Sequence, residues 1–391
     1  MNKYLERANQ LVPELVENRR HFHRHPEVRN ELFETVKYVK AQLEDMGYQV
    51  QEICQCGLVV LAGGKKPGKC ILIRGDMDAL PMPEDTGLEF SSENPGAMHA
   101  CGHDLHMAML LGAAKLLKAH EEELQGLVIL MFQPGEETLS GARSMIEDGC
   151  LENPKPDHAV AIHIAGEPYQ TGQVKLSRGT IAASSDNYRI ILHGKGGHGA
   201  SPQNSINPIF AAAKIVEAFT DIGRYEVDPQ QPTVVNTCSI HAGTTYNIIP
   251  NDCEIRGTVR TFNEEVRANL LSRIQETVEK ICSLYRCTFE FYNDFSTPSN
   301  YSEEAFSDEL YAMLKRDLEG VEVLPLDSSR MMGSEDFAYV SQKISSCSLS
   351  LGASNPDIPH FPAHHPKVQF DEKAFAYGAA TYAQAALSYL K

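Results

Sequence analysis

Thiol, imidazole and carboxylate side chains stand at or near the ends of short apolar runs in this sequence. In chain order they are Asp76, Asp78, Cys101, His103, Glu136, Glu137, His163, His364 and His365. These side-chain types bind transition-metal ions, and a carboxylate beside a bound ion can accept a proton. We therefore expect a metal site that is assembled from several separate segments of the chain.

The number of expected ligands indicates how many ions this site holds. The ligands are Cys101, His103, Glu137, His163 and one of His364 and His365. Five ligands exceed what one tetrahedral Zn²⁺ takes, but they suit two ions that share a bridging ligand. A thiolate bridges well, and a helix N-terminus favours the ionised form of Cys101. We expect two divalent ions.

Glu136 and Glu137 are neighbours, so both can reach the site. One can bind metal while the other acts as a base, which takes a proton from an acidified water and delivers it to a leaving amine. Asp78 is expected to orient a ligand imidazole. This combination of residues predicts metal-dependent hydrolysis.

Four apolar runs predict buried strands, at Cys70–Ile73, Leu127–Phe132, Ala159–Ile164 and Ser348–Leu351. Helical spacing of apolar residues predicts helices at 3–24, 31–46 and Asp104–Ala119. Strands and helices that alternate in this way indicate an α/β layer with a largely parallel sheet. Ligands bind beyond the carboxyl ends of such strands, which is where the reactive residues stand.

The pattern changes near residue 184. Strands at Tyr188–Leu192, Val234–Ile240, Cys253–Thr261 and Cys287–Tyr292, with two intervening helices, give the order β-α-β-β-α-β. That order is typical of a ferredoxin-like α+β domain. We expect a discontinuous α/β domain, residues 1–184 and 296–391, with the ferredoxin-like domain, 185–295, inserted.

Charge and cysteine content restrict the partners and the compartment. Lys and Arg number 35 and Asp and Glu 52, a formal net charge of −17 that disfavours nucleic acid and anionic membranes. The first residues lack the apolar region of a secretory signal, and the 10 cysteines are read as thiols of a reducing compartment. We expect a cytoplasmic location.

Six segments together resemble one enzyme family. They are MHACGHD (98–104), QPGEE (133–137), GKGGHGASP (194–202), NIIP (247–250), GTVRTF (257–262) and GSEDFAY (333–339). They are similar to motifs of the M20 peptidase family, above all to its bacterial aminoacylases, hippurate hydrolases, N-acetyldiaminopimelate deacetylases and plant auxin-conjugate hydrolases. The resemblance runs through nearly the whole chain in the expected order.

The resemblance implies a role for several residues. It favours His364 over His365, since the family pattern His-x-Pro reads His364-His365-Pro366 here, and it makes Glu136 the general base. It also implies that 185–295 is a lid and dimerisation domain. In that domain His198 would polarise the scissile carbonyl, often across a dimer interface, and Asn247 and Arg260 would approach the substrate carboxylate.

The sequence departs from the family pattern at three positions. Gly75 stands where Ala is usual, Ala363 where Leu is usual, and Val368 where an aromatic residue is usual. The last two would widen the pocket, so the sequence does not name the acyl group or the amino acid.

We expect hydrolysis of N-acyl amino acids to an acid and a free amino acid, through a water that bridges the two metals and is activated by Glu136. Zn²⁺ or Mn²⁺ would serve, with Co²⁺ or Ni²⁺ as alternatives. A homodimer through 185–295 is expected. The alternatives are a dipeptidase or carboxypeptidase of the same fold, and a metal-binding module without activity.

Overall fold

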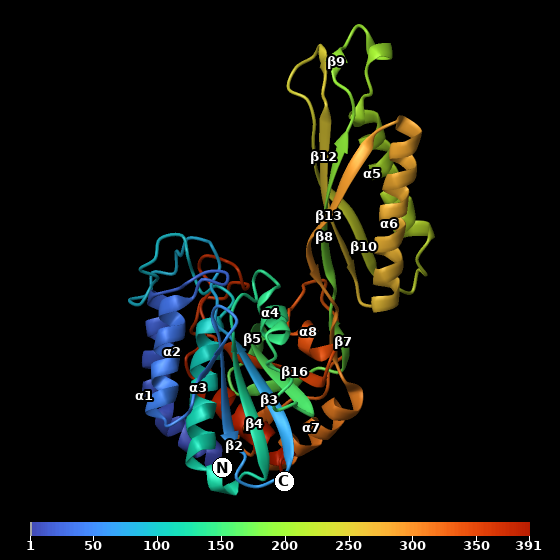
Figure 1. Cartoon of the computed structure of the whole chain (residues 1–391). Coiled ribbons are helices and arrows are strands. Elements are labelled where there is room, and N and C mark those ends of the chain that lie inside the picture. The colour runs from blue at the N-terminus through green and yellow to red at the C-terminus, as the bar shows by residue number, and fades with distance from the viewer. Residues whose placement is uncertain (1) are drawn as a thin grey trace. The chain divides into compact units, whose positions relative to one another are not determined.

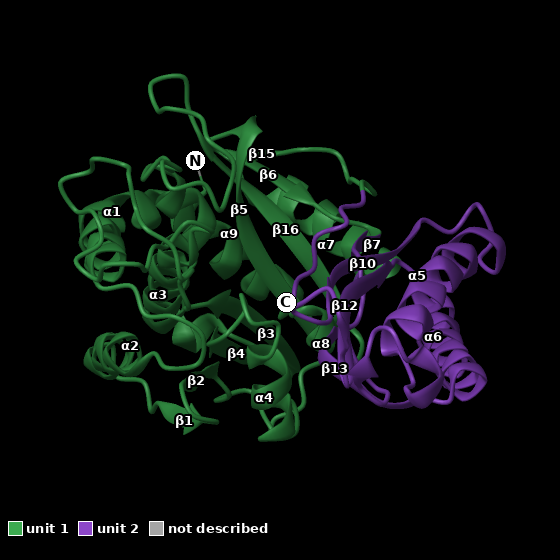
Figure 2. Ribbon diagram, turned by 90° about the horizontal axis from the view of Figure 1, so that it is seen from above, with its two compact units in different colours: residues 1–179, 301–329, 336–391 green, residues 180–300, 330–335 purple. Residues whose placement is uncertain are grey.

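The computed structural model describes residues 2–391, which divide into two compact units (Figures 1 and 2). Unit 1 comprises the chain up to Gly179, Tyr301–Ser329 and Asp336–Lys391, and unit 2 comprises Thr180–Asn300 and Arg330–Glu335. The chain thus crosses between units a few residues away from the expected boundaries. The 330–335 segment, expected in the α/β domain, clusters with unit 2, where Met331 N donates to Ile181 O.

Unit 1 is built on an eight-stranded sheet in the order β1-β2-β4-β3-β5-β16-β6-β15. The strands are β1 Gln51–Ile53, β2 Gly57–Gly63, β3 Lys69–Asp76, β4 Gly126–Gln133, β5 His158–Gln170, β6 Gln173–Leu176, β15 Glu322–Val323 and β16 Ser345–Ser354. The four central strands, β4, β3, β5 and β16, are parallel, whereas β2 and β6 run antiparallel to their central neighbours. The sheet is mixed, with a parallel centre that brings the carboxyl ends of β3 and β4 together.

Helices cover both faces of this sheet. They are α1 Lys3–Arg24, α2 Phe33–Asp45, α3 His103–Ala119, α4 Gly141–Glu147, α7 Glu304–Asp317, α8 Ala338–Ser341 and α9 Ala374–Tyr389. Alternate strand residues enter two cores: Ile71 and Ile73 pack with α1, α3 and α9, whereas Leu72 packs with α4 and α8. The α/β class expected from the sequence is confirmed, in three layers.

Several elements were not predicted from the sequence. The most deeply placed is α9, whose residues are all buried except Tyr377, so it has no polar face that could mark it as a surface helix. The expected strand Ala159–Ile164 is also longer in the structure, because β5 continues to Gln170. His163 therefore lies within a strand and not at its end, opposite Ser350 of β16.

Unit 2 is a four-stranded antiparallel sheet in the order β10-β12-β8-β13. Its elements are β8 Ser185–His193, α5 Pro208–Tyr225, β10 Thr233–His241, β12 Asp252–Thr261, α6 Glu264–Tyr285 and β13 Thr288–Thr297, with the short pair β9 Gly197–His198 and β11 Ile248–Ile249. The strand order is that of a ferredoxin-like fold, as expected. The remaining short strands, β7 Gly179–Ala182 and β14 Asn300–Ser302, lie where the chain crosses between units.

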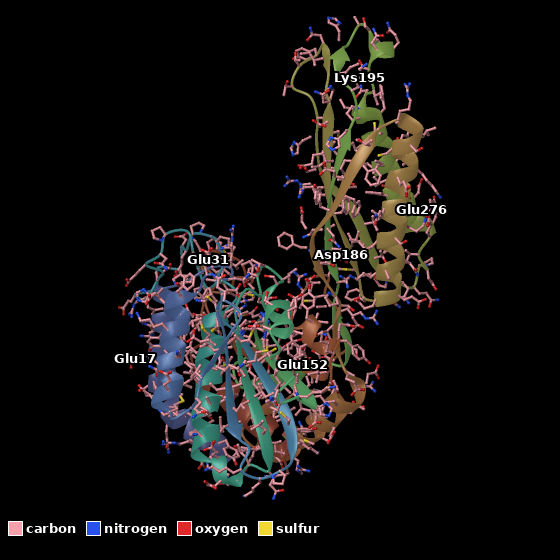
Figure 3. All side chains as sticks on the ribbon, in the orientation of Figure 1. Glu17, Glu31, Glu152, Asp186, Lys195 and Glu276 are labelled. Atoms are coloured by element: carbon pink, nitrogen blue, oxygen red, sulfur yellow. The ribbon has the colours of Figure 1, made fainter. Side chains whose placement is uncertain are left out.

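A buried ion pair ties α6 to the sheet of unit 2. Asp186, labelled in Figure 3, is 1% exposed and accepts from Nε and Nη2 of Arg267 and from Oγ of Ser296. Loss of one partner would leave a buried charge uncompensated. No helix within residues 2–391 has the length and apolar character that crossing a membrane requires.

Candidate metal centre

The expected ligands of unit 1 meet at the carboxyl ends of β3 and β4 and the first turn of α3. Gly102 allows this approach, because its φ of 86° is left-handed and a Cβ there would meet Cδ1 of Ile164 at 2.0 Å. The helix begins at His103, one residue before the expected start at Asp104. Cys101 and His103 therefore flank a turn that only glycine can form.

Among the overlapping groups of potential ligand atoms that lie within 4.8 Å of one another here, three consist only of expected ligands and Glu136. The groups are Cys101, His103 and His163; Cys101, Glu137 and His364; and His103, Glu136 and Glu137. All five expected ligands and Glu136 are thus brought together. Cys101 belongs to two of the groups, which is the arrangement that two ions sharing a thiolate need.

The unsatisfied polar atoms at this place fit metal binding. Nε2 of His103 is buried and has no hydrogen-bond partner among residues 2–391, and the buried Oε1 of Glu137 faces Nε2 of His364 only at the long distance of 3.5 Å. Buried polar atoms in proteins are otherwise almost always paired, or they face an ion or water. Sulfur, nitrogen and oxygen donors together suit transition-metal cations. The side chains present therefore fit two divalent ions.

Neighbouring charges set the protonation of the ligands. Burial alone would raise the pKa of the Cys101 thiol, but His163, His103 and His364 outweigh it and lower that pKa to about 6. Hydrogen bonding to Cys101 and to Glu137 raises the pKa of His364 to about 10. Before metal binds, the site thus holds a thiolate beside an imidazolium at neutral pH.

The two candidate histidines near the C-terminus, His364 and His365, have different neighbours in the structure. Nε2 of His364 lies 3.5 Å from Oε1 of Glu137, and the backbone N–H of His364 donates to the carbonyl of Ala100, next to Cys101. His365 instead stacks on the ring of Phe361. His364 is therefore the histidine that lies beside the other ligands.

Asp78 contacts three of the residues at this site. Its backbone carbonyl accepts from Nδ1 of His103 at 2.7 Å, which leaves Nε2 of that ring for a metal. Its carboxylate accepts from the backbone N–H of Glu136 at 2.9 Å and of Glu137 at 3.0 Å. Asp78 thus orients the imidazole through its carbonyl, and its carboxylate holds the turn that carries both glutamates.

Sequence reasoning missed a second buried network behind the ligands. Asp76 accepts from Nη1 of Arg74 and from Nδ1 of His106, and Nε2 of His106 accepts from the N–H of Ile164. His106 therefore holds the backbone next to His163, whose own Nδ1 donates to the Ile164 carbonyl. The only indication of this role in the sequence is that His106 lies one turn after His103. A histidine at that position is equally compatible with simple packing in the core.

A third network joins α1 to the start of α3. Oδ2 of Asp104 accepts from Nε of Arg19 and Nδ1 of His23, both at 2.7 Å, and all three side chains are buried. His23 also lies 3.2 Å from Glu84. The signal in the sequence was Arg19 and His23 at a spacing of four, which places them on one face of a helix.

Unit 2 holds the other three expected site residues, and Arg260 lies apart from the other two. His198 of β9 pairs with Ile248 of β11, and the adjacent Gly199 N–H donates to the Asn247 carbonyl, so His198 and Asn247 share one tip. Arg260 lies near the far end of β12, eight residues after Asp252, or about 26 Å along the strand. Figure 1 shows β9 beyond the opposite end of β12. Within one chain, His198 and Arg260 are therefore far apart.

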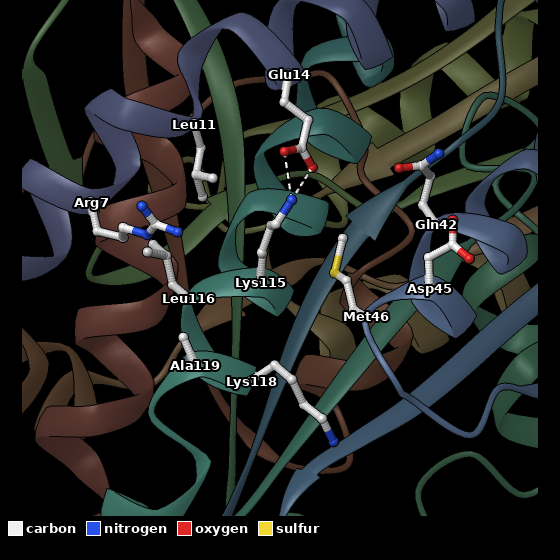
Figure 4. A pocket seen from close by; sticks show the side chains of 10 residues that line it. All are labelled: Arg7, Leu11, Glu14, Gln42, Asp45, Met46, Lys115, Leu116, Lys118 and Ala119. Carbon is white, nitrogen blue, oxygen red and sulfur yellow. Dashed lines mark hydrogen bonds and ion pairs between the residues drawn. The ribbon is translucent and has the colours of Figure 1, made fainter.

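A surface pocket of about 420 Å³ lies between α1, α2 and α3 (Figure 4). Lys115 donates to both carboxylate oxygens of Glu14 across its wall. None of the expected metal ligands lines this pocket. The candidate metal centre is a different place on unit 1.

Comparison with known proteins identifies the family. The family model described as peptidase family M20/M25/M40 matches residues 72–388. The chain belongs to this family. It is therefore an M20 hydrolase, and the resemblance seen in the sequence is confirmed.

Two relatives show the range of activities named in the family. Thermostable carboxypeptidase 1 of Saccharolobus solfataricus is 37% identical over 96% of this chain and 95% of its own length. N-acetyl-L-cysteine deacetylase of Bacillus subtilis is 34% identical over 93% of this chain and 85% of its own length. The first name is that of a carboxypeptidase and the second that of a deacetylase of an N-acetyl amino acid.

Two solved structures share the fold along the whole chain. A putative aminohydrolase from methicillin resistant Staphylococcus aureus has a TM-score of 0.93 at 32% identity and covers 100% of both chains. The Bacillus subtilis YXEP protein, described as a dinuclear metal binding peptidase from the M20 family, has a TM-score of 0.81 at 30% identity and covers 97% and 98%. The two-ion arrangement thus has a precedent in this fold.

Replacing Asp78 with alanine should weaken metal binding by about 10- to 100-fold, since the Glu136–Glu137 turn loses both its hydrogen-bond acceptors. Competition with a chromogenic chelator measures this change. Asp157→Ala is the control, because Asp157 accepts from Cys70 N at the other end of β3. Equal metal affinity in folded Asp78→Ala and wild-type protein would contradict the role given to Asp78.

Metal binding at pH 7 should release about two protons. The pKa values of His103 and His364 are both raised, so each imidazole is protonated before it becomes a ligand. Calorimetric titration with Zn²⁺ in two buffers of different ionisation enthalpy measures the number. His364→Ala should release about one proton fewer, and an unchanged number would show that His364 is not a protonated ligand.

Proposed function

We propose that this protein hydrolyses the amide bond of N-acyl amino acids, such as N-acetyl and N-benzoyl derivatives, to a carboxylic acid and a free amino acid. The observation that carries the proposal is the position of Glu136. Its carboxylate lies within 4.8 Å of the ligand atoms of His103 and Glu137, and the side chain is 7% exposed. A site that only stores metal has no use for an additional carboxylate at this place.

The proposed ligands are Cys101, His103, Glu137, His163 and His364. Two divalent cations bound there would supply Lewis acidity, which lowers the pKa of water and polarises an amide carbonyl. The mixed donor set suits Zn²⁺ or Mn²⁺, with Co²⁺ or Ni²⁺ as alternatives. We place the protein in the cytoplasm, because all ten cysteines are unpaired thiols.

Glu136 is the proposed general base. It takes the proton of the attacking water and later gives it to the departing amine, so the carboxylate returns to its starting state. The Asp78 carboxylate supports this role by fixing the Glu136 backbone. The backbone of Glu136 is therefore held in place before substrate binds.

His198 is the proposed donor to the carbonyl oxygen, while Arg260 and Asn247 are the proposed contacts of the substrate carboxylate. His198 is exposed, and its Nδ1 accepts from the Ala200 N–H at 3.1 Å, so Nε2 carries the proton that it would donate. Because His198 and Arg260 are separated within unit 2, one small substrate reaches both only if they come from two copies. We therefore propose a homodimer formed through unit 2.

A carboxypeptidase is the second candidate, since a relative with that name is 37% identical. It would use the same ligands and base on a peptide bond. N-acyl amino acids and dipeptides therefore have to be compared directly.

Release of amine from N-acetyl and N-benzoyl amino acids and from dipeptides tests the proposal. Activity should vanish in chelated protein and return with one of Zn²⁺, Mn²⁺, Co²⁺ or Ni²⁺, with N-acyl amino acids preferred. Glu136→Gln should lower kcat by about 10²- to 10⁴-fold with metal content unchanged. Dipeptides as the preferred substrates would favour the carboxypeptidase, and a fully active Glu136→Gln would remove Glu136 as base.

The two-copy arrangement predicts complementation between inactive variants. When His198→Ala and Arg260→Ala chains are mixed, each heterodimer should regain one complete site, so about a quarter of the wild-type rate should return. A mixture of His198→Ala and Asn247→Ala is the control, because both residues lie on the same tip. Without recovery in the first mixture, His198 and Arg260 do not come from different copies.

A further inference from the structure

Two buried side chains of unit 1 have polar atoms without hydrogen-bond partners, and they flank one short segment. His99 is 2% exposed and Asp104 is 0% exposed. Both ring nitrogens of His99 and Oδ1 of Asp104 have no partner among residues 2–391. The segment between them contains Cys101 and His103, two of the proposed metal ligands. The unpaired polar atoms therefore stand on either side of the ligands.

The two oxygens of the Asp104 carboxylate differ in their contacts. Oδ2 accepts from Nε of Arg19 and from Nδ1 of His23, both at 2.7 Å. Burial alone would raise the pKa of Asp104, but the charge of Arg19 and the hydrogen bond from His23 outweigh it and lower that pKa. The carboxylate is therefore ionised, and a buried ionised oxygen without a donor is strongly unfavourable. Oδ1 needs a donor.

His99 lies near Asp104 and its ring is neutral. Burial lowers the pKa of His99 to about 3, and the Asp104 carboxylate is the charge that opposes this fall. A neutral imidazole has one N–H donor and one nitrogen that accepts. No direct hydrogen bond joins the two side chains, since the polar atoms of both are unpaired. A small group that accepts from His99 and donates to Asp104 would satisfy both.

We propose that a buried water bridges His99 and Asp104, and that His99 is a positioning residue for the ligand segment between them. The water accepts from the N–H of His99 and donates to Oδ1 of Asp104. Waters are found inside proteins where about two to four polar groups have no other partner. This inference rests on the proposed function, because the segment matters to activity only if Cys101 and His103 bind metal.

The bridge connects both ends of the ligand segment to α1. Asp104 is already anchored on α1 by Arg19 and His23, and the water extends this anchor to His99, on the other side of the left-handed turn at Gly102. The turn is then held before metal binds. Contacts that orient metal ligands from outside contribute about 10- to 100-fold to metal affinity.

A high-resolution crystal structure of the wild-type protein tests the water directly. A density peak should lie about 2.7–3.2 Å from a ring nitrogen of His99 and about 2.5–3.0 Å from Oδ1 of Asp104. A direct hydrogen bond between the two side chains, or the absence of such a peak, would overturn the proposal. This result does not depend on whether the protein binds metal or hydrolyses any substrate.

The Zn²⁺ affinity of two variants tests the positioning role. His99→Leu removes the donor and should weaken Zn²⁺ binding about ten-fold, whereas His99→Gln keeps an N–H and should restore most of the affinity. A side chain that only filled space would change the thermal unfolding midpoint and leave the affinity as it is. Unchanged affinity in folded His99→Leu, or an equal loss in His99→Gln, would therefore overturn the role.

His158→Leu is the matched control. His158 begins β5 in the same unit, and its Nδ1 is likewise buried without a partner. This substitution should leave the Zn²⁺ affinity unchanged. If His99→Leu does not fold, the wild-type crystal structure still decides whether the water is present. If the wild type binds no metal, the proposed function fails and the positioning role fails with it, whereas the water is judged separately.

Discussion

The metal centre depends on one buried residue, Asp78, which joins two segments that are far apart in the chain. Its carbonyl fixes the His103 ring, and its carboxylate holds the backbone of Glu136 and Glu137. Desolvation raises the pKa of this carboxyl, and donors from His103 and Glu136 oppose that rise. The hydrogen bonds from His103 and Glu136 therefore help to keep the buried Asp78 carboxyl ionised, and the ionised carboxylate in turn holds the Glu136–Glu137 turn.

A second buried network also holds a metal ligand in place. Arg74 and Asp76 form a buried ion pair that fixes His106 and, through Ile164, the backbone beside His163. Buried ion pairs add little net stability, but losing one partner is costly because the other charge remains desolvated. The main effect of these networks is therefore to fix the positions of the metal ligands. Their contribution to the free energy of unfolding is small.

Part of this account could be predicted from the sequence. The apolar runs located β3, β4 and β5, and the rule that ligands bind beyond parallel strands placed Cys101, His103 and Glu137 together. The role of Asp78 was predicted only in part, because the contact to His103 uses its backbone carbonyl, which no side-chain pattern reveals. Helix α9 was missed because a helix buried on all sides lacks the polar face that periodicity detects.

Other features depend on contacts between distant segments. The Asp104 carboxylate is satisfied by Arg19 and His23 of α1, and nothing local in either segment indicates that they meet. The separation of Arg260 from Asn247 follows from the length and direction of β12. The motifs NIIP and GTVRTF do not indicate that length or direction.

The central claim is that five side chains hold two ions while Glu136 binds neither. A crystal structure of the metal-loaded protein, with data collected at the absorption edge of the metal, tests it most directly. The account predicts two anomalous peaks per chain, each about 2.0–2.3 Å from its ligands, with Cys101 between them. A single peak, or an ion coordinated by the Glu136 carboxylate, would contradict it.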